Sequence, residues 1–166
     1  NLLYKKNLSF HFLPLEKFNF VSVKNKYIFF LEQLLINLKN AKLEYLRAGD
    51  VASQIEDKRY FNQQALLRNR FFHEVLSQLQ NENINLKDLV DSNFNFDQLL
   101  ISSIKGLNNN AYEKCLETDT HLKGLYQNIM LLPLDSSLFE KQFERIESAI
   151  AHHETLHTSF NFASDN

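Results

Sequence analysis

The sequence predicts an all-α protein: an antiparallel four-helix bundle with a long crossover that carries a short extra helix, plus an irregular N-terminal arm. The chain has only 3 Gly and 2 Pro among 166 residues, far fewer turn-forming residues than an all-β sandwich or barrel needs. Hydrophobic residues make up 44% of the chain, which is enough for a core. From about residue 26 they recur every three or four positions, as on the buried face of a helix.

Residues 1–25 are predicted to form an arm outside the bundle. Segments 9–13 and 18–23 alternate in a way typical of short strands. Two strands alone are marginally stable in water, so we expect the arm to be extended or loosely ordered. Its phenylalanines could form a strand that docks on a partner or a second copy, or they could contact a lipid surface. These residues are Phe10, Phe12, Phe18 and Phe20.

Four stretches carry a sustained helical stripe of apolar residues. They are residues 26–55, 58–80, 111–131 and 136–157. A few residues separate the first two stretches, and a segment around Pro133 separates the last two. Such short connections produce antiparallel helical hairpins.

The connection between the two hairpins is longer. Residues 81–95 are rich in Asn and lack a stripe, which favours local side-chain bonding over helix. Residues 96–107 are predicted to form a short helix. We therefore expect one domain over residues 26–158, followed by a frayed tail over 159–166. Two hairpins joined by one long crossover is the plan of a ferritin-like bundle.

Several segments also resemble a bacterial ferritin-like family of unknown function. Leu38–Asp50 is similar to the first helix of that family. The segments similar to the other three helices follow in the same order. They are Lys58–Arg68 with Phe71 and Glu74, then Ile104–Leu107 and Glu113–Asp119 with Tyr126, then Phe139–Glu147. The resemblance covers roughly residues 28–157. It implies a small, stand-alone bacterial protein with a ferritin-like fold and a stress-related role.

Arg68 is the most informative polar residue, because it falls on the inward stripe of the second predicted helix. A buried guanidinium stays charged and needs a partner. Asp119, at the edge of the third stripe, is the predicted partner, with the hydroxyl of Tyr45 or Tyr126 nearby. The alternative is that Arg68 extends along the edge of the bundle into solvent.

A ferritin-like di-metal centre requires carboxylates from two helices and a Glu-x-x-His pair from each of the other two. In the second and fourth predicted helices, Glu74 and Glu147 are followed three positions later by Ser77 and Ile150, which are not His. We therefore expect no metal and no cofactor. The alternative is that the acids beside the stripes bind iron or manganese. These acids are Glu44, Glu74, Asp119 and Glu147.

His153 and His157 are four residues apart, a spacing that can chelate Zn, Ni or Cu. We expect instead a solvated helix end, where histidine interacts favourably with the helix dipole. Cys115 lies on an apolar stripe and is expected to be a buried, inert thiol.

Charge and cysteine content restrict the classes of partner. Lys and Arg total 18 and Asp and Glu 20, a net charge of −2, which argues against a nucleic-acid partner. No apolar run is long enough to span a bilayer.

One cysteine cannot form an internal disulfide, so a reducing, cytoplasmic location is expected. The chain does not begin with Met, consistent with a processed or truncated start.

Two functions follow as expectations. The first is a non-catalytic ferritin-like bundle of unknown biochemical activity that acts through its surface, by self-association or by binding a protein partner. The second is a ferritin-like protein that binds iron or manganese for redox chemistry or storage. A shared fold does not by itself transfer a function.

Overall fold

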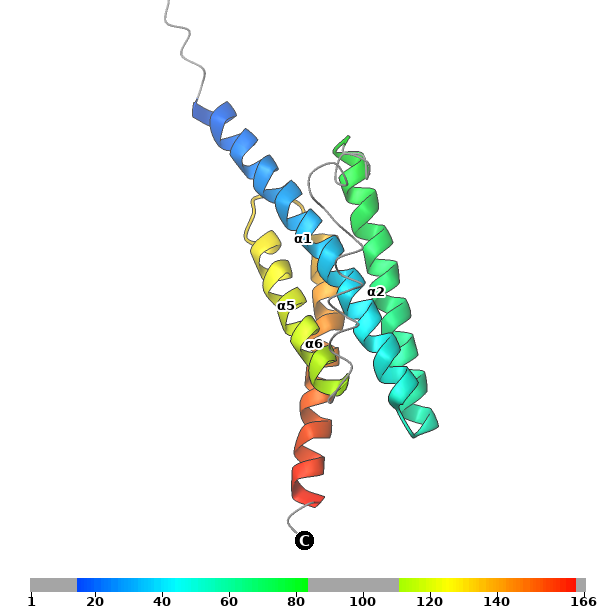
Figure 1. Ribbon diagram of the computed structural model, residues 1–166. Coiled ribbons are helices and arrows are strands. Elements are labelled where there is room, and N and C mark those ends of the chain that lie inside the picture. The colour runs from blue at the N-terminus through cyan, green and yellow to red at the C-terminus, as the bar shows by residue number, and fades with distance from the viewer. Residues whose placement is uncertain (1–14, 84–110, 164–166) are drawn as a thin grey trace, which may run out of the picture.

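The computed structural model describes residues 15–83 and 111–163, with side chains described for 22–83 and 111–155. These residues form four helices and their connecting turns, with no strand (Figure 1). The helices are α1 (Leu15–Val51), α2 (Ile55–Asn81), α5 (Ala111–Met130) and α6 (Ser137–Ala163). The prediction of an all-α protein with four packed helices is confirmed.

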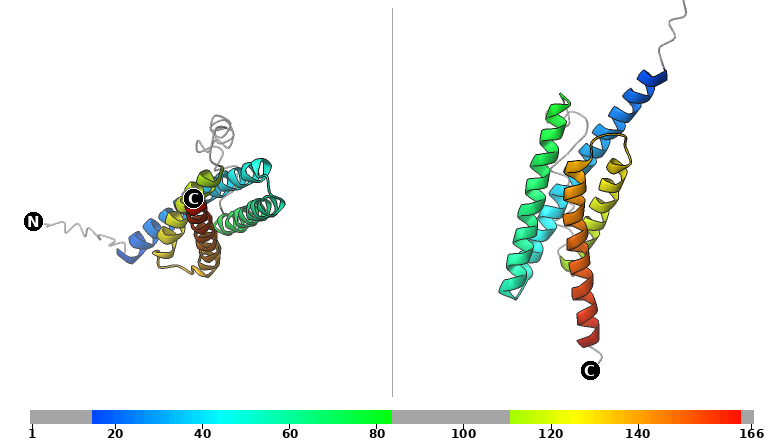
Figure 2. Two further views of the ribbon diagram at one scale, coloured as in Figure 1. Left: turned by 90° about the horizontal axis from the view of Figure 1, so that it is seen from below. Right: turned by 180° about the vertical axis from the view of Figure 1, so that it is seen from behind.

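Helices α1 and α5 form the link between the two hairpins. Helix α1 packs against α2 and against α5, while α6 packs against α5. The end-on view in Figure 2 shows the pair α1 and α2 beside the pair α5 and α6. Helix α1 extends past the other helices at one end of the bundle, and α6 extends past them at the other (Figures 1 and 2).

The turns between paired helices follow local chemistry. The first turn of α2 carries Glu56 and Asp57, whose negative charges are favourable at a helix N-terminus. Before α6, the carboxylate of Asp135 accepts a hydrogen bond from the backbone N–H of Ser137 at 3.0 Å. Short connections therefore fix both hairpins, as the sequence predicts.

Helix α1 begins eleven residues before the predicted start at residue 26, so the strand predicted over residues 18–23 is wrong. The spacing of Phe20, Val23 and Tyr27 is also compatible with a helix. Extending an existing helix needs no new nucleation, whereas an isolated two-stranded hairpin is barely stable. Helix α6 likewise continues past the predicted end at 157, to Ala163.

Other predictions lie outside the described residues. These are the strand over residues 9–13, the short helix over 96–107 and nearly all of the crossover. None of the described helices is both long enough and apolar enough to cross a bilayer.

The core has two parts. The larger part is an apolar cluster of α1, α2, α5 and α6 residues, among them Leu34, Val75 and Ile146. The smaller part surrounds Tyr45 and Phe61, close to the turn between α1 and α2. Small residues allow α1 and α2 to approach there. They are Ala48, Gly49, Ala52 and Ala65.

Replacing Gly124 with Ala is expected to raise the free energy of unfolding by about 0.5–1 kcal/mol, because Ala favours a helix interior. A Cβ atom at Gly124 would meet nothing within 4 Å. At Gly49 it would lie 3.0 Å from Oδ1 of Asn62, so Gly49→Ala serves as the comparison and should gain less. Urea unfolding measures both. A lower stability of Gly124→Ala would contradict the description of α5.

Candidate functional site

The centre of the described bundle contains a buried ion pair. The Nη2 atom of Arg68, on α2, lies 2.6 Å from Oδ2 of Asp119, on α5, and both side chains are 0% exposed. The 3–4 residue stripe that buries Ala65 and Phe71 also directs Arg68 inward. The structure therefore brings together these two residues and does not extend Arg68 into solvent.

Tyr45 of α1 joins the ion pair. Its hydroxyl donates to Oδ2 of Asp119 at 2.5 Å and accepts a hydrogen bond from Nη2 of Arg68 at 3.3 Å. The guanidinium carbon lies 4.4 Å from the centre of the Tyr45 ring, which adds a cation–π interaction. The Nη1 atom of Arg68 donates to the side-chain and backbone oxygens of Gln64. Three helices thus meet through one guanidinium.

His153 of α6 completes the cluster. Its Nε2 atom lies 2.9 Å from the hydroxyl of Tyr45. The hydroxyl proton is directed at Asp119, so Nε2–H is the donor to Tyr45. The prediction that His153 is solvated at a helix end is wrong: it is 4% exposed and lies ten residues before the end of α6. Its place on the apolar stripe of that helix was the signal for burial.

Burial controls the protonation of this cluster. It raises the pKa of Asp119, against the opposing effect of the Arg68 charge. Burial is the largest single effect on Arg68 and would lower its pKa, but the charge and hydrogen bond of Asp119 together with Tyr45 and Tyr60 outweigh burial, so the pKa is raised. Burial, followed by the charges of His152 and Arg68, lowers the pKa of His153 from 6.5 to about 4. At neutral pH the imidazole is therefore uncharged, while the guanidinium keeps its charge.

Several buried polar atoms of this region have no hydrogen-bond partner among the described residues. They are Nε of Arg68, Oδ1 of Asp119, Nδ1 of His153 and the hydroxyl of Tyr60. The ion pair is therefore monodentate: it leaves the Nε–H of Arg68 and the Oδ1 atom of Asp119 without a partner among the described residues. Leaving a buried polar group unpaired costs about 1–3 kcal/mol. The cluster specifies how the helices pack more than it stabilises them.

Tyr126 makes a separate polar connection. Its hydroxyl donates to Oε1 of Gln142 at 2.8 Å, and Nε2 of Gln142 donates to Oε2 of Glu74 at 2.6 Å. This chain joins α5, α6 and α2. Of the two tyrosines considered from the sequence, only Tyr45 bonds to the ion pair.

The four acids proposed as alternative metal ligands bind four different groups. Glu44 pairs with Arg47 at 3.2 Å, and Glu147 pairs with Lys123 at 2.9 Å. Glu74 binds Gln142 and lies 3.7 Å from Arg70, while Asp119 binds Arg68. Among the described side chains, those of residues 22–83 and 111–155, no three His, Cys, Asp or Glu form a group that could hold a metal.

Two further candidates occupy different surroundings. Cys115 is buried in the cluster around Tyr45, and burial raises its thiol pKa, which keeps the thiol protonated. Glu154 and His157 have a Glu-x-x-His spacing that the sequence analysis did not consider. Glu154 is exposed and so does not face the bundle centre. The side chain of His157 lies outside the described ones, so the His153–His157 chelate stays a prediction.

No protein-family model, curated protein or solved structure matches the chain. The described geometry is therefore the ground for any statement about function.

Replacing Asp119 with Ala should lower the free energy of unfolding by about 3–5 kcal/mol, because it leaves the Arg68 guanidinium buried and unpaired. The double replacement Arg68→Met with Asp119→Leu should cost less than Asp119→Ala alone, because it removes both charges. Urea unfolding of Arg68→Met, Asp119→Leu and their double variant measures the coupling, and Asp119→Ala is measured beside them. A loss below ~0.5 kcal/mol for Asp119→Ala would contradict a buried pair.

Replacing Tyr126 with Phe should cost about 1–3 kcal/mol, because it removes the donor to the buried oxygen of Gln142. The matched control is Tyr60→Phe, which removes a hydroxyl that has no partner in the described part of the chain. Its cost should be near zero or negative. Equal losses in thermal unfolding would argue against the Tyr126–Gln142–Glu74 connection.

Proposed function

We propose that this chain is a non-catalytic helical bundle of ferritin-like plan, in which a buried ion pair takes the place of a di-metal centre. It works through its surface, by binding a protein partner or a second copy of itself. The main observation behind this proposal is the buried position of Arg68 at the centre of the bundle. The bacterial and stress-related parts rest on the sequence resemblance alone.

The electrostatics of the bundle centre support a function without metal. A di-metal site of this plan needs inward carboxylates and imidazoles that are free to bind cations. Here the central carboxylate of Asp119 is bound by Arg68 and Tyr45. The guanidinium is charged at all physiological pH values, and its charge opposes the entry of a divalent cation.

The burial of the polar groups supports a function without catalysis. A catalytic residue must reach its substrate. The side chains of Arg68, Asp119, Tyr45 and His153 are 0–4% exposed, and the Cys115 thiol is buried as well. The arrangement fixes how the helices pack and presents no reactive group to a substrate.

The surface offers apolar contacts for a partner. Five large apolar side chains in the described part of the chain are more than half exposed. They are Phe29, Val51, Ile55, Leu66 and Leu131. Val51 and Ile55 lie on either side of the turn between α1 and α2. Single exposed apolar residues are common in soluble proteins, so these residues are candidate contacts and do not define an interface.

The alternative proposal is a ferritin-like protein that binds iron or manganese through Glu44, Glu74, Asp119 and Glu147 for redox chemistry or storage. It requires three of these acids to exchange their present cationic or amide partners for a metal. Asp119 would also have to leave Arg68 unpaired, which is costly.

Metal loading decides between the two proposals. The full chain is incubated anaerobically with Fe(II) or Mn(II), passed through a desalting column and subjected to elemental analysis. We expect a metal content close to zero, because the Arg68 charge opposes binding at the centre. Asp119→Asn, which removes the central carboxylate, serves as the matched control for surface binding. About two ions per chain, lost in Asp119→Asn, would overturn the proposal.

A further inference from the structure

The ring of His153 is enclosed by aromatic side chains from the three other helices. Its centre lies 5.8 Å from the ring of Tyr45 on α1 and 6.4 Å from that of Tyr112 on α5. On α2 it lies 6.0 Å from Tyr60 and 6.2 Å from Phe61, which is stacked at 16°. One side chain of α6 therefore contacts all of the other described helices.

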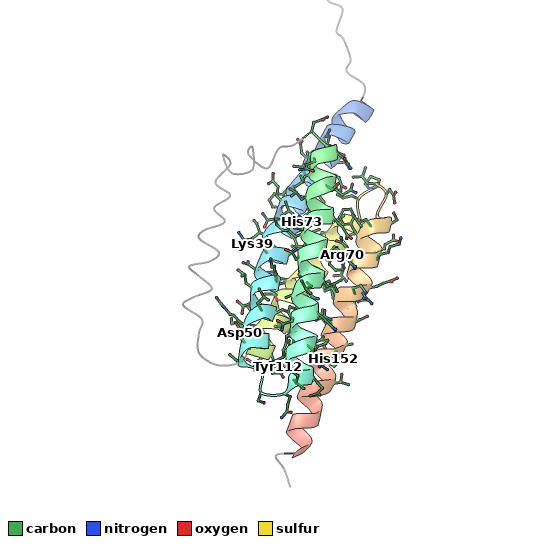
Figure 3. The ribbon with its side chains drawn as sticks, turned by 90° about the vertical axis from the view of Figure 1, so that its right-hand side faces the viewer. Lys39, Asp50, Arg70, His73, Tyr112 and His152 are labelled. Atoms are coloured by element: carbon green, nitrogen blue, oxygen red, sulfur yellow. The ribbon has the colours of Figure 1, made fainter. Side chains whose placement is uncertain are left out.

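This contact holds the C-terminal part of α6 against the other helices. The inward stripe of α6 runs through Gln142, Ile146 and Ala149 to His153, the last described buried side chain of the helix. The neighbouring Ala151, His152, Glu154 and Thr155 are exposed. The helix then continues past the ends of the other helices to Ala163 (Figures 1 and 2). Figure 3 shows Tyr112 and His152 at this end of the bundle.

The surroundings of His153 favour a neutral ring. Nε2–H donates to Tyr45, and Nδ1 has no partner among the described residues. A proton added to Nδ1 would create a donor with no acceptor in a buried position. It would also place a second positive charge near Arg68, whose charge already disfavours the protonated ring.

Among the described residues, the acids and other titratable groups around the ring do not offset the cost of adding a proton to Nδ1 of His153. Asp119 of α5 is separated from the ring by the hydroxyl of Tyr45, and Asp57 of α2 accepts the hydroxyl of Tyr112 at 3.1 Å. On α6 itself, His152 adds a repulsive charge, and Glu154 is exposed. The remaining neighbours carry no charge at neutral pH, because burial raises their pKa values. They are Tyr45, Tyr60, Tyr112 and Cys115.

We propose that His153 holds the C-terminal part of α6 in place at neutral pH and releases it in acid. Protonation of its ring frees the helix from about Ile150 onward, while the Arg68–Asp119 pair and the first part of α6 remain packed. This inference does not depend on the proposed function. Release uncovers the aromatic faces of Tyr60, Phe61 and Tyr112 at one end of the bundle.

The pH range follows from linkage. In the packed state burial holds the pKa of His153 near 4, whereas the released ring returns to its ordinary value of 6.5. The stabilisation is therefore complete above pH 6.5 and is lost as the pH falls towards 4. From these values, the equilibrium constant for release should rise roughly 70-fold between about pH 7.5 and 4.5.

Hydrogen exchange of the full chain, read by mass spectrometry on peptides and corrected for the intrinsic rate at each pH, tests the proposal. Amides of residues 150–155 should lose protection on acidification before those of residues 137–146. His153→Gln keeps a donor for Tyr45 but does not titrate, and its protection should not depend on pH in this range. His121→Gln, which replaces an exposed histidine of α5 outside the cluster, is the matched control and should behave like the unaltered chain.

Three results would overturn the proposal. The first is unchanged protection of residues 150–155 down to pH 4.5. The second is the same loss of protection in His153→Gln as in the unaltered chain. The third is simultaneous loss along all four helices, which would indicate global unfolding. If His153→Gln does not fold, His153→Phe, which fills the aromatic enclosure and cannot be protonated, takes its place with the same expectations.

Discussion

A guanidinium that is buried away from water needs an anion beside it. In this bundle α1, α5 and α2 itself supply the side chains that bond to Arg68. Asp119 provides the opposite charge from α5, Tyr45 bridges the two from α1, and Gln64 binds Nη1 from the preceding turn of α2. Because these contacts are directional, they fix the rotation and height of α2 against α1 and α5. Apolar packing alone would allow neighbouring registers at a similar free energy.

Two separate polar connections join the four described helices. The ion pair, Tyr45 and His153 together join all four described helices. The chain from Tyr126 through Gln142 to Glu74 joins α5, α6 and α2 through a different set of side chains. Helices α2 and α6 thus meet through long polar and aromatic side chains, whereas α1 packs directly against both α2 and α5. The cost of these polar groups is offset by the apolar core beside them, which includes Leu34 and Val75.

Helical periodicity in the sequence predicted the positions of the helices better than the contacts of the polar cluster. The stripes locate all four described helices, with Arg68 on an inward face and Asp119 at the edge of one, because a 3–4 residue repeat follows directly from helix geometry. The ends of the helices were less predictable: residues 18–23 fit both a strand pattern and a helix pattern. The pattern for His153 was present but misread, since a histidine near an expected helix end is usually assigned to solvent.

From the sequence alone it follows that the chain is helical, that two hairpins form, and that Arg68 lies on an inward stripe, with its burial and its extension into solvent left as alternatives. Each of these follows from local spacing and connection length. Three features became visible only in the folded chain: the Tyr45 hydroxyl bonds to the ion pair, the four candidate acids bind separate partners, and His153 lies among aromatic rings of three helices. Such contacts depend on the rotation and axial offset of helices that are distant in the sequence. No spacing within a single helix specifies those two quantities.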